Sequence, residues 1–199
     1  MSNILRLGAN VQISHGFETA PEYAKSIGAN FIQIFLRNAQ SYVPNPRSHK
    51  SMKRFKKNLK KNNCGCVVHS SFVINLARPS DQYQHYKGVW NIIEDLNNSV
   101  QIGAIGAIIH MGKNIKDEHM TESEAMANYV EGVETSLLNS DPKSTLILET
   151  GAGCGTEICV QLEKLGQIRN MVDAKLRHRV KFCIDTCHIY AAGYPINFP

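Results

Sequence analysis

Short β-rich runs alternate with longer, helix-compatible segments along the whole chain, and this alternation limits the possible folds most strongly. Such a pattern is typical of parallel β/α proteins, because two parallel neighbouring strands need a crossover connection that is usually a helix. The expected strands cover residues 5–11, 31–36, 66–71, 104–110, 145–149 and 180–185. We therefore predict one α/β domain over residues 1–199. An open doubly wound sheet and an eight-stranded (β/α)₈ barrel both fit this pattern.

The segments between these runs carry helix signals. Thr121 and Glu124 fit a capping box at the start of one helix. In residues 81–102, apolar side chains recur at helical spacing, and we expect one face to hold Tyr83, Tyr86, Val89, Trp90, Ile93 and Leu96. The other expected helices cover residues 18–28, 47–61 and 156–165, with a short one before Arg179.

Composition describes an ordinary globular chain of 199 residues with a formal net charge of +5. Much of that charge lies in the basic segment 47–61, for which a solvated outer face is favoured over direct phosphate contact. We expect an intracellular protein without a membrane partner, in the cytoplasm or the nucleus, because no long apolar run or signal peptide is visible. The six cysteines form no CxxC pair, and we expect reduced thiols in or near the core.

Four consecutive expected strands carry, at or near their carboxyl ends, side chains that can bind metals: His69, His110, Glu149 and Asp185. They are separated by 41, 39 and 36 residues, about one strand-plus-helix unit each. The carboxyl ends of parallel barrel strands meet at one mouth, so these side chains should gather there. Histidine, glutamate and aspartate are usual ligands of zinc and manganese. The spacing therefore predicts a metal site at the mouth.

Two further features follow these strand ends. His188, in DTCH, lies three residues after Asp185, so the pair could serve two neighbouring metals, with Glu149 bridging them. Sites with more than one metal suit phosphodiester cleavage, because they stabilise the attacking and the leaving oxygen together. The glycine-rich string at 150–155 lacks the acidic partner of a dinucleotide site, and we expect a tight loop close to a substrate phosphate.

Several motifs together resemble the endonuclease IV family of apurinic/apyrimidinic endonucleases. They are GANV, FIQIFLRNAQSY, VVHSSFVINLA, IIHMG, LILETGAGCG and FCIDTCHIYAAGY. They spread over almost the whole chain, and the strings HSSFVINLA, LETGAGCG and CIDTCH are specific in combination. The resemblance implies a TIM-type (β/α)₈ barrel that holds up to three metal ions, usually zinc, with manganese as the alternative.

By the resemblance, His69 and His110 match ligands of the first metal, and Glu149 matches the catalytic carboxylate that bridges the first and second metals. Asp185 matches a ligand of the second metal and His188 a ligand of the third. The implied substrate is double-stranded DNA with an abasic site. A metal-activated hydroxide would hydrolyse the phosphodiester bond 5′ to that site and leave a 3′-hydroxyl, as base excision repair requires.

Three residues match loop positions that contact DNA in the family. Phe72 and Val73 stand where side chains are inserted into the duplex, and Phe72 replaces the usual tyrosine. Gln40 stands where an arginine is usual, which removes a cation from the DNA contact. Asn10 replaces a histidine of the motif near the start.

The family pattern continues beyond the DTCH motif with two more strands and further ligands, whereas here only about six βα units are present. We therefore expect weak or no activity from these 199 residues alone, with a second, complementing C-terminal polypeptide as a candidate partner. Two alternatives stay open. One is a sugar isomerase or epimerase with a single metal in the same barrel. The other is a non-catalytic DNA-binding remnant.

Overall fold

One parallel sheet of six strands forms the centre of the computed structural model, which describes residues 5–14, 16–115 and 119–196. The strands are β1 (Gly8–Asn10), β2 (Phe31–Phe35), β3 (Gly65–His69), β4 (Ala107–Ile109), β5 (Leu146–Glu149) and β6 (Val180–Cys183). Their order in the sheet is their order in the chain, and every neighbouring pair is parallel. A doubly wound sheet reverses its order at a switch point, so this order is that of a TIM-type barrel.

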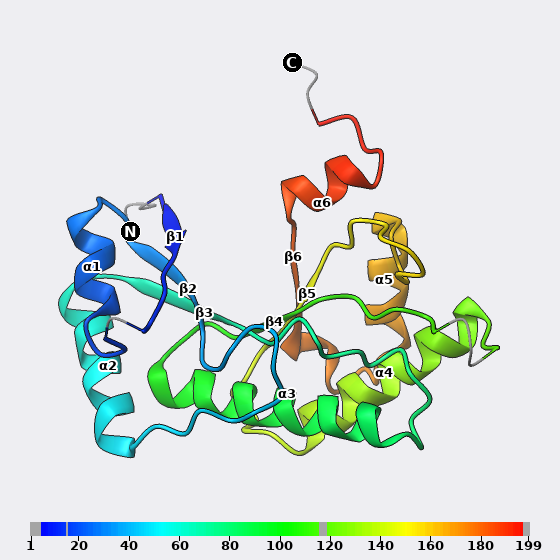
Figure 1. The fold of residues 1–199 in the computed structure, drawn as a ribbon, viewed down its shortest axis with the longest axis horizontal. Helices are drawn as coiled ribbons and strands as arrows, with labels where there is room; N and C mark the ends of the chain where they lie inside the picture. The colour runs from blue at the N-terminus through cyan, green and yellow to red at the C-terminus, as the bar shows by residue number, and fades with distance from the viewer. Residues whose placement is uncertain (1–4, 15, 116–118, 197–199) are drawn as a thin grey trace.

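A helix follows each strand, and α1 to α5 lie outside the sheet. They are α1 (Ala20–Ser26), α2 (His49–Lys61), α3 (Tyr83–Ile102), α4 (Glu122–Leu138), α5 (Leu162–Met171) and α6 (Thr186–Ala191), with a 3₁₀ turn η2 (Arg177–Arg179) before β6. In Figure 1 the helices α1 to α5 form an outer arc, with α1 and α2 at the left, α3 and α4 below and α5 at the right. The predicted capping box is confirmed, because the side chains of Thr121 and Glu124 each bond the other's backbone N–H at the start of α4.

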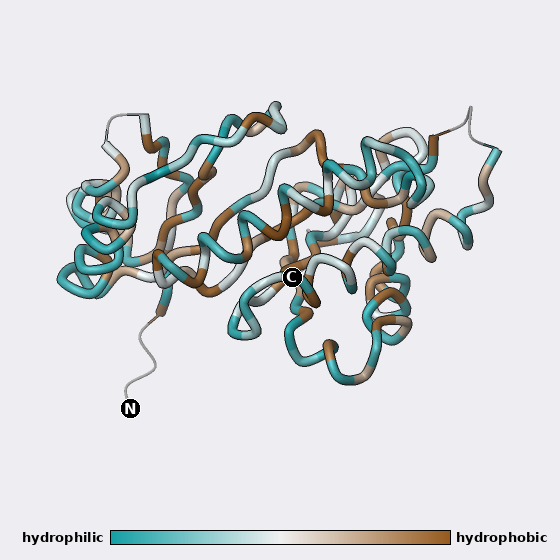
Figure 2. Tube along the Cα trace, turned by 90° about the horizontal axis from the view of Figure 1, so that it is seen from below, coloured by the Kyte–Doolittle hydropathy of each residue, from teal (hydrophilic) through white to brown (hydrophobic). Residues whose placement is uncertain are grey.

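The sheet packs on both faces. On the outer face the strands and helices form the main core, which includes the fully buried Ile32, Ile34, Phe55, Leu96, Leu137 and Leu148. On the inner face Val67, Ile108 and Ile147 form a separate small cluster with Phe31 and Cys183. In the tube of Figure 2, hydrophobic residues concentrate along the central segments, and α1 and α2 at the left are largely hydrophilic. Burial on both sides explains why β3 to β5 read as nearly continuous apolar runs.

The two outermost strands are less covered than the central ones. Among the described residues, β1 and β6 each pair with one strand only. All residues of β4 and β5 are buried, whereas Lys181 and Phe182 in β6 are exposed, as are Gly8 and Asn10 in β1. The carboxyl end of β6 is therefore supported by β5 alone among the strands that the structure describes.

The apolar face expected for α3 is not buried throughout. Tyr83, Tyr86 and Trp90 are 67%, 61% and 58% exposed, while Val89 and Leu96 are buried and Ile93 is half-buried. The true buried face also carries polar side chains, namely His85, Asn91, Asp95 and Ser99. These side chains have hydrogen-bond partners inside the protein, so their burial is tolerated. The apolar residues alone therefore do not define the buried face of α3, because buried polar side chains form part of it.

Two elements after β5 differ from the expectation. The helix expected at 156–165 is α5, which starts only at Leu162. The loop before it is held by Glu157, whose carboxylate accepts hydrogen bonds from the backbone N–H groups of Gly153 and Cys154 at 2.8 and 3.2 Å. Helix α6 was not expected. It begins because Asp185 caps it by accepting bonds from the N–H groups of Cys187 and His188.

The six cysteines are free thiols, as expected. Four of them are buried or half-buried, and burial raises the pKa of the Cys66, Cys159 and Cys183 thiols, so these groups stay protonated near neutral pH. Cys154 and Cys187 are exposed, so the expected core position is wrong for these two, which lie in the loop after β5 and in α6. Within the described ranges, no helix has the length and apolar character that a membrane crossing requires.

Candidate metal centre

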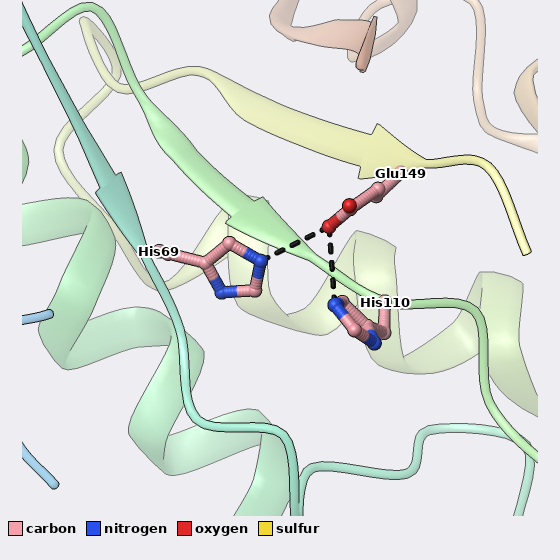
Figure 3. Close-up of side chains that lie close together, drawn as sticks. All are labelled: His69, His110 and Glu149. Atoms are coloured by element: carbon pink, nitrogen blue, oxygen red, sulfur yellow. Dashed lines mark hydrogen bonds and ion pairs between the residues drawn. The ribbon is translucent and has the colours of Figure 1, made fainter. Parts of the chain in front are cut away.

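Three predicted ligands meet where β3, β4 and β5 end. His69 is the last residue of β3, His110 follows β4 directly, and Glu149 is the last residue of β5. The Nε2 atoms of His69 and His110 lie 3.0 and 3.1 Å from the same carboxylate oxygen, Oε2 of Glu149. Figure 3 shows both rings pointing toward this carboxylate. The expected convergence of strand ends therefore occurs for these three residues.

His69 is fixed by the backbone beside it. Its Nδ1 lies 2.7 Å from the carbonyl oxygen of Ser70, and because a carbonyl only accepts, Nδ1 carries a proton. In the neutral ring Nε2 then has a lone pair, and this lone pair faces the carboxylate oxygen of Glu149. Two acceptors at this distance repel each other unless a proton or a metal cation lies between them. A metal-binding histidine is commonly anchored through its other nitrogen in this way.

Glu149 is a buried carboxylate, with 6% of its surface exposed. Burial disfavours the charged form. In the metal-free protein, a proton on Nε2 of His110 and of His69 would donate to the carboxylate, and these hydrogen bonds and the accompanying positive charge lower the pKa of Glu149 to about 2. The carboxylate is therefore ionised at neutral pH. Its other oxygen, Oε1, lies 3.6 Å from Nδ1 of His188, so Glu149 faces two groups of side chains at once.

His110 is held by a residue that the sequence did not single out. The hydroxyl of Tyr129, on α4, donates to the carbonyl oxygen of His110 at 3.1 Å. Tyr129 is fully buried, and burial raises the pKa of its hydroxyl well above the ordinary value, so this donor keeps its proton. The ring of His110 packs edge-on against those of His69 and His188, with centroids 5.1 and 5.5 Å away.

The second group consists of Glu149, Asp185 and His188, whose candidate ligand atoms lie within 4.8 Å of one another. Thr150 connects its members. The Thr150 hydroxyl accepts from the backbone N–H of Asp185 at 2.9 Å, and the Thr150 carbonyl accepts from Nδ1 of His188 at 2.8 Å. Asp185 and His188 are half-buried, and one oxygen of Asp185 already caps α6.

These two groups fit a metal ion of the zinc type. Nitrogen and carboxylate oxygen are the donors that zinc takes together, at about 2.0–2.2 Å, so two ligands of one tetrahedral ion stand about 3.4 Å apart. The 3.0 and 3.1 Å separations between the histidine nitrogens and Glu149 are close to this value. His69, His110 and Glu149 also satisfy the wider distance limit of 4.8 Å as a group of three. A bound cation would remove the opposition of lone pairs between His69 and Glu149.

A buried ion-pair network supports the loops around the first group. Arg37, which follows β2, bonds Asp95 and Glu94 on α3 at 2.8 Å each, and also Asn91. Arg37 and Asp95 are 6% and 1% exposed. In the sequence, only two features indicate this network. Arg37 directly follows a predicted strand, and Asp95 lies inside an amphipathic helix. It fixes the loop after β2 to α3.

The predicted DNA-contacting residues lie at the rim of this centre. Phe72 and Val73 are 47% and 36% exposed, and the Phe72 ring lies 5.2 and 5.0 Å from the rings of His69 and His110. The N–H of Phe72 donates to the carbonyl of Ala39, so the loop with Gln40 packs against the loop with Phe72. The side chain of Gln40 is exposed, next to this contact in the sequence.

A cavity of about 550 Å³ lies beside the cluster, lined by His110, His188, Phe72, Arg78, Lys113 and Cys154 among others. Two cations and an aromatic ring beside candidate metal-binding side chains suit a phosphate-bearing ligand. The loop at 150–155, predicted to lie near a substrate phosphate, also borders this cavity. Two of its N–H groups, those of Gly153 and Cys154, are already bonded to Glu157. A second cavity, of about 630 Å³, is lined by Asn10, Arg37 and Asn38 among others.

Known proteins are similar to this chain in sequence and in fold. Residues 21–198 match the family model described as Xylose isomerase-like TIM barrel. A putative endonuclease 4 of Acanthamoeba polyphaga mimivirus is 41% identical over 98% of this chain and 63% of its own length. The crystal structure of endonuclease IV from Thermus thermophilus superposes with a TM-score of 0.80 at 25% identity, over 96% of this chain and 66% of that one. The chain thus spans less than two thirds of the viral relative.

Sugar-converting enzymes share only the fold. D-psicose 3-epimerase from Clostridium cellulolyticum H10 superposes with a TM-score of 0.74, but its identity is 14% over 96% of this chain and 67% of that one. The family model and the structural superposition therefore both confirm the TIM-barrel prediction. The higher sequence identity is with the endonucleases.

Proposed function

Since the chain belongs to the endonuclease IV family, we propose that it is a metal-dependent phosphodiesterase of DNA repair that cuts duplex DNA 5′ to an abasic site. The observation that carries this proposal is that the Nε2 atoms of His69 and His110 converge on one carboxylate oxygen of Glu149 at the barrel mouth. Two neutral imidazoles and a carboxylate form a donor set suited to zinc.

We assign His69, His110 and Glu149 to a first metal, and Asp185 and His188 to further metals beside it. When bound, the metals supply Lewis-acid stabilisation of the phosphate and activation of water. Glu149 would act as the bridge, because its two oxygens face the two groups. Its low pKa keeps both oxygens available as ligands at neutral pH. The backbone carbonyls of Ser70 and Thr150 orient the rings of His69 and His188.

The rim would recognise the lesion. An apolar side chain inserted at an abasic site displaces no base, so unstacking costs least there. Phe72 and Val73 are exposed at the rim, and the contacts of their backbone with Ala39 and with the Tyr42 hydroxyl hold them in place. Lys113 and Arg78 in the adjacent cavity supply positive charge for the flanking phosphates.

The test is single-turnover cleavage of a duplex with one central abasic site, with protein in excess so that slow cleavage is measured. We expect zinc-dependent nicking on the 5′ side, loss on chelation, and a product that a polymerase extends. E149Q should lose nicking, because the carboxylate shared by both groups becomes a neutral amide. E163Q is the matched control, since Glu163 is exposed on α5. Equal nicking by E149Q and wild type would overturn the proposal.

A further inference from the structure

The basic charge of the chain is concentrated on one helix. Eight of the 22 lysine and arginine residues lie in residues 47–61, and this segment contains no aspartate or glutamate. Because the whole chain has a formal net charge of +5, the remainder has a net charge of −3. The positive character of the protein is therefore a property of α2 and its N-terminal flank.

Four lysines of α2 form a stripe. Lys50, Lys53, Lys57 and Lys60 are all exposed, and at 100° per residue their directions fall within about 80° of one another. The opposite face, with Met52, Phe55 and Leu59, is buried in the core. We call these four residues the lysine stripe.

The lysine stripe lacks neutralising partners. On its flank toward α1, Arg54 and Lys61 form exposed ion pairs with Glu18 and Glu22 at 3.4 and 3.8 Å. Within the described ranges, none of the four stripe lysines forms an ion pair. Lysines three and four residues apart repel each other, and Lys50 in the first turn also opposes the helix dipole. The stripe therefore weakens the helix slightly, and its charge is available to a ligand.

We propose that the lysine stripe binds the phosphate backbone of duplex DNA outside the metal centre. From Lys50 to Lys60 it extends about 15 Å, which matches about four base-pair steps of 3.4 Å. An anionic membrane fits less well, because a helix that binds a membrane inserts its apolar face. Here that face is packed in the core, with Phe55 at 0% and Leu59 at 4% exposed.

The stripe begins on the side of the mouth. Because α2 follows the carboxyl end of β2, parallel β/α topology places its first turn on that side of the sheet. Arg47 fixes this turn by donating to the carbonyl of Leu36 at 2.7 Å, and its guanidinium stacks on Phe17. A duplex that leaves the mouth along α2 would meet Lys50 first. The inference rests on the proposed function only in taking duplex DNA as the partner.

The experiment compares K50Q/K53Q/K57Q with K25Q/K143Q/K175Q, which removes the same charge from exposed lysines elsewhere. Binding of an undamaged duplex of about 30 base pairs is measured by fluorescence anisotropy in EDTA over a series of salt concentrations. We expect the stripe variant to bind at least about 10-fold more weakly at low salt, with a salt slope shallower by about 1 per lysine. The control should retain nearly the wild-type slope. Circular dichroism verifies that both variants are folded.

Equal losses in the two variants would overturn the proposal, because they would indicate a net-charge effect without a defined surface. It would also be overturned if wild-type protein bound phosphatidylserine vesicles but not the duplex. Since no cleavage is measured, failure of the abasic-site activity leaves this result unaffected. Conversely, if the wild-type protein shows metal-dependent nicking and the stripe variant binds the duplex as tightly as wild type, the lysine-stripe proposal is rejected and the proposed function stands.

Discussion

The two candidate ligand groups share Glu149 but differ in how the protein holds the rest of their residues. His69 and His110 stand at the ends of β3 and β4, which have neighbours on both sides, and His69 is 4% exposed. Asp185 and His188 follow β6, which pairs only with β5 among the described strands, and both are half-buried. His69 and Glu149 are therefore built into the core, whereas the side chain of His110 is 29% exposed, as open as that of His188 at 25%. The first group stands on central strands, and the second follows a strand at the margin.

This difference indicates which group is preorganised. Around the first group, Tyr129 holds the backbone of His110, and Arg37 and Asp95 fix the neighbouring loop. The second group depends on Thr150 and on the short helix α6. Metal ligands whose orientation is fixed by outer contacts bind more tightly, typically by about 10–100-fold. We infer that the first group binds metal more tightly than the second.

The largest expected effect comes from removing the support of the first group. D95A removes the fully buried carboxylate that pairs with Arg37 and leaves only the partly exposed Glu94 and the neutral Asn91, so we expect the free energy of unfolding to fall by about 3–5 kcal/mol. Urea denaturation of the metal-free protein measures this change. E94A is the control, because Glu94 is 30% exposed and its bond to the same guanidinium should contribute only about 1 kcal/mol. Similar losses in both variants would contradict the assignment of a buried supporting pair.

The next effect is on metal affinity. E149Q removes the shared carboxylate, and we expect zinc affinity to fall more than about 100-fold, above the range for outer contacts alone. Competition with a fluorescent chelator measures the affinity, with E163Q as the matched control. Unchanged affinity in E149Q would show that zinc binds elsewhere.

The comparison itself is tested by H69A and H188A. We expect H69A to lower the affinity for the first zinc by about 10–100-fold, because it removes a buried, anchored ligand. H188A should leave that affinity within a few fold and reduce only the weaker binding, since His188 belongs to the second group. Isothermal titration calorimetry separates the two phases. A larger effect of H188A on the tight phase would reverse the ranking.

A smaller effect concerns acid stability. The pKa of Glu149 is lowered from 4.5 to about 2 on folding, so its contribution is present above pH 4.5 and is lost as pH falls toward 2. In metal-free protein, protonation of this carboxylate should lower the free energy of unfolding by about 1 kcal/mol as the pH falls from about 4.5 to 3.5. E149Q should lack this component, as paired urea titrations would reveal. An equal or steeper loss in E149Q over that range would contradict it.

The sequence predicted the strands and strand-end residues well because both depend on local pattern. Runs such as LILE are apolar and β-rich, and Glu149 ends one of them, so its place at the mouth follows from the parallel topology. Long-range pairing was not predictable in the same way. Asp95 occupies a core position because Arg37, 58 residues away, neutralises it, and this hid the buried face of α3.

Competition between roles explains the other differences. The sequence predicts Asp185 as a metal ligand, and the structure shows that it also caps α6. Its carboxylate accepts hydrogen bonds from the backbone N–H groups of Cys187 and His188. Glu157 suggested the inside of a helix, but its carboxylate stabilises the loop before α5. Polar residues that serve the backbone and polar residues that serve a ligand look alike in a single sequence.

The most direct test of the metal centre is anomalous X-ray diffraction from crystals of this chain grown with zinc, recorded on both sides of the zinc absorption edge. We predict an anomalous peak bounded by Nε2 of His69, Nε2 of His110 and Oε2 of Glu149, absent in E149Q crystals. Zinc found only at other side chains, or no zinc at this cluster under saturating conditions, would contradict the account.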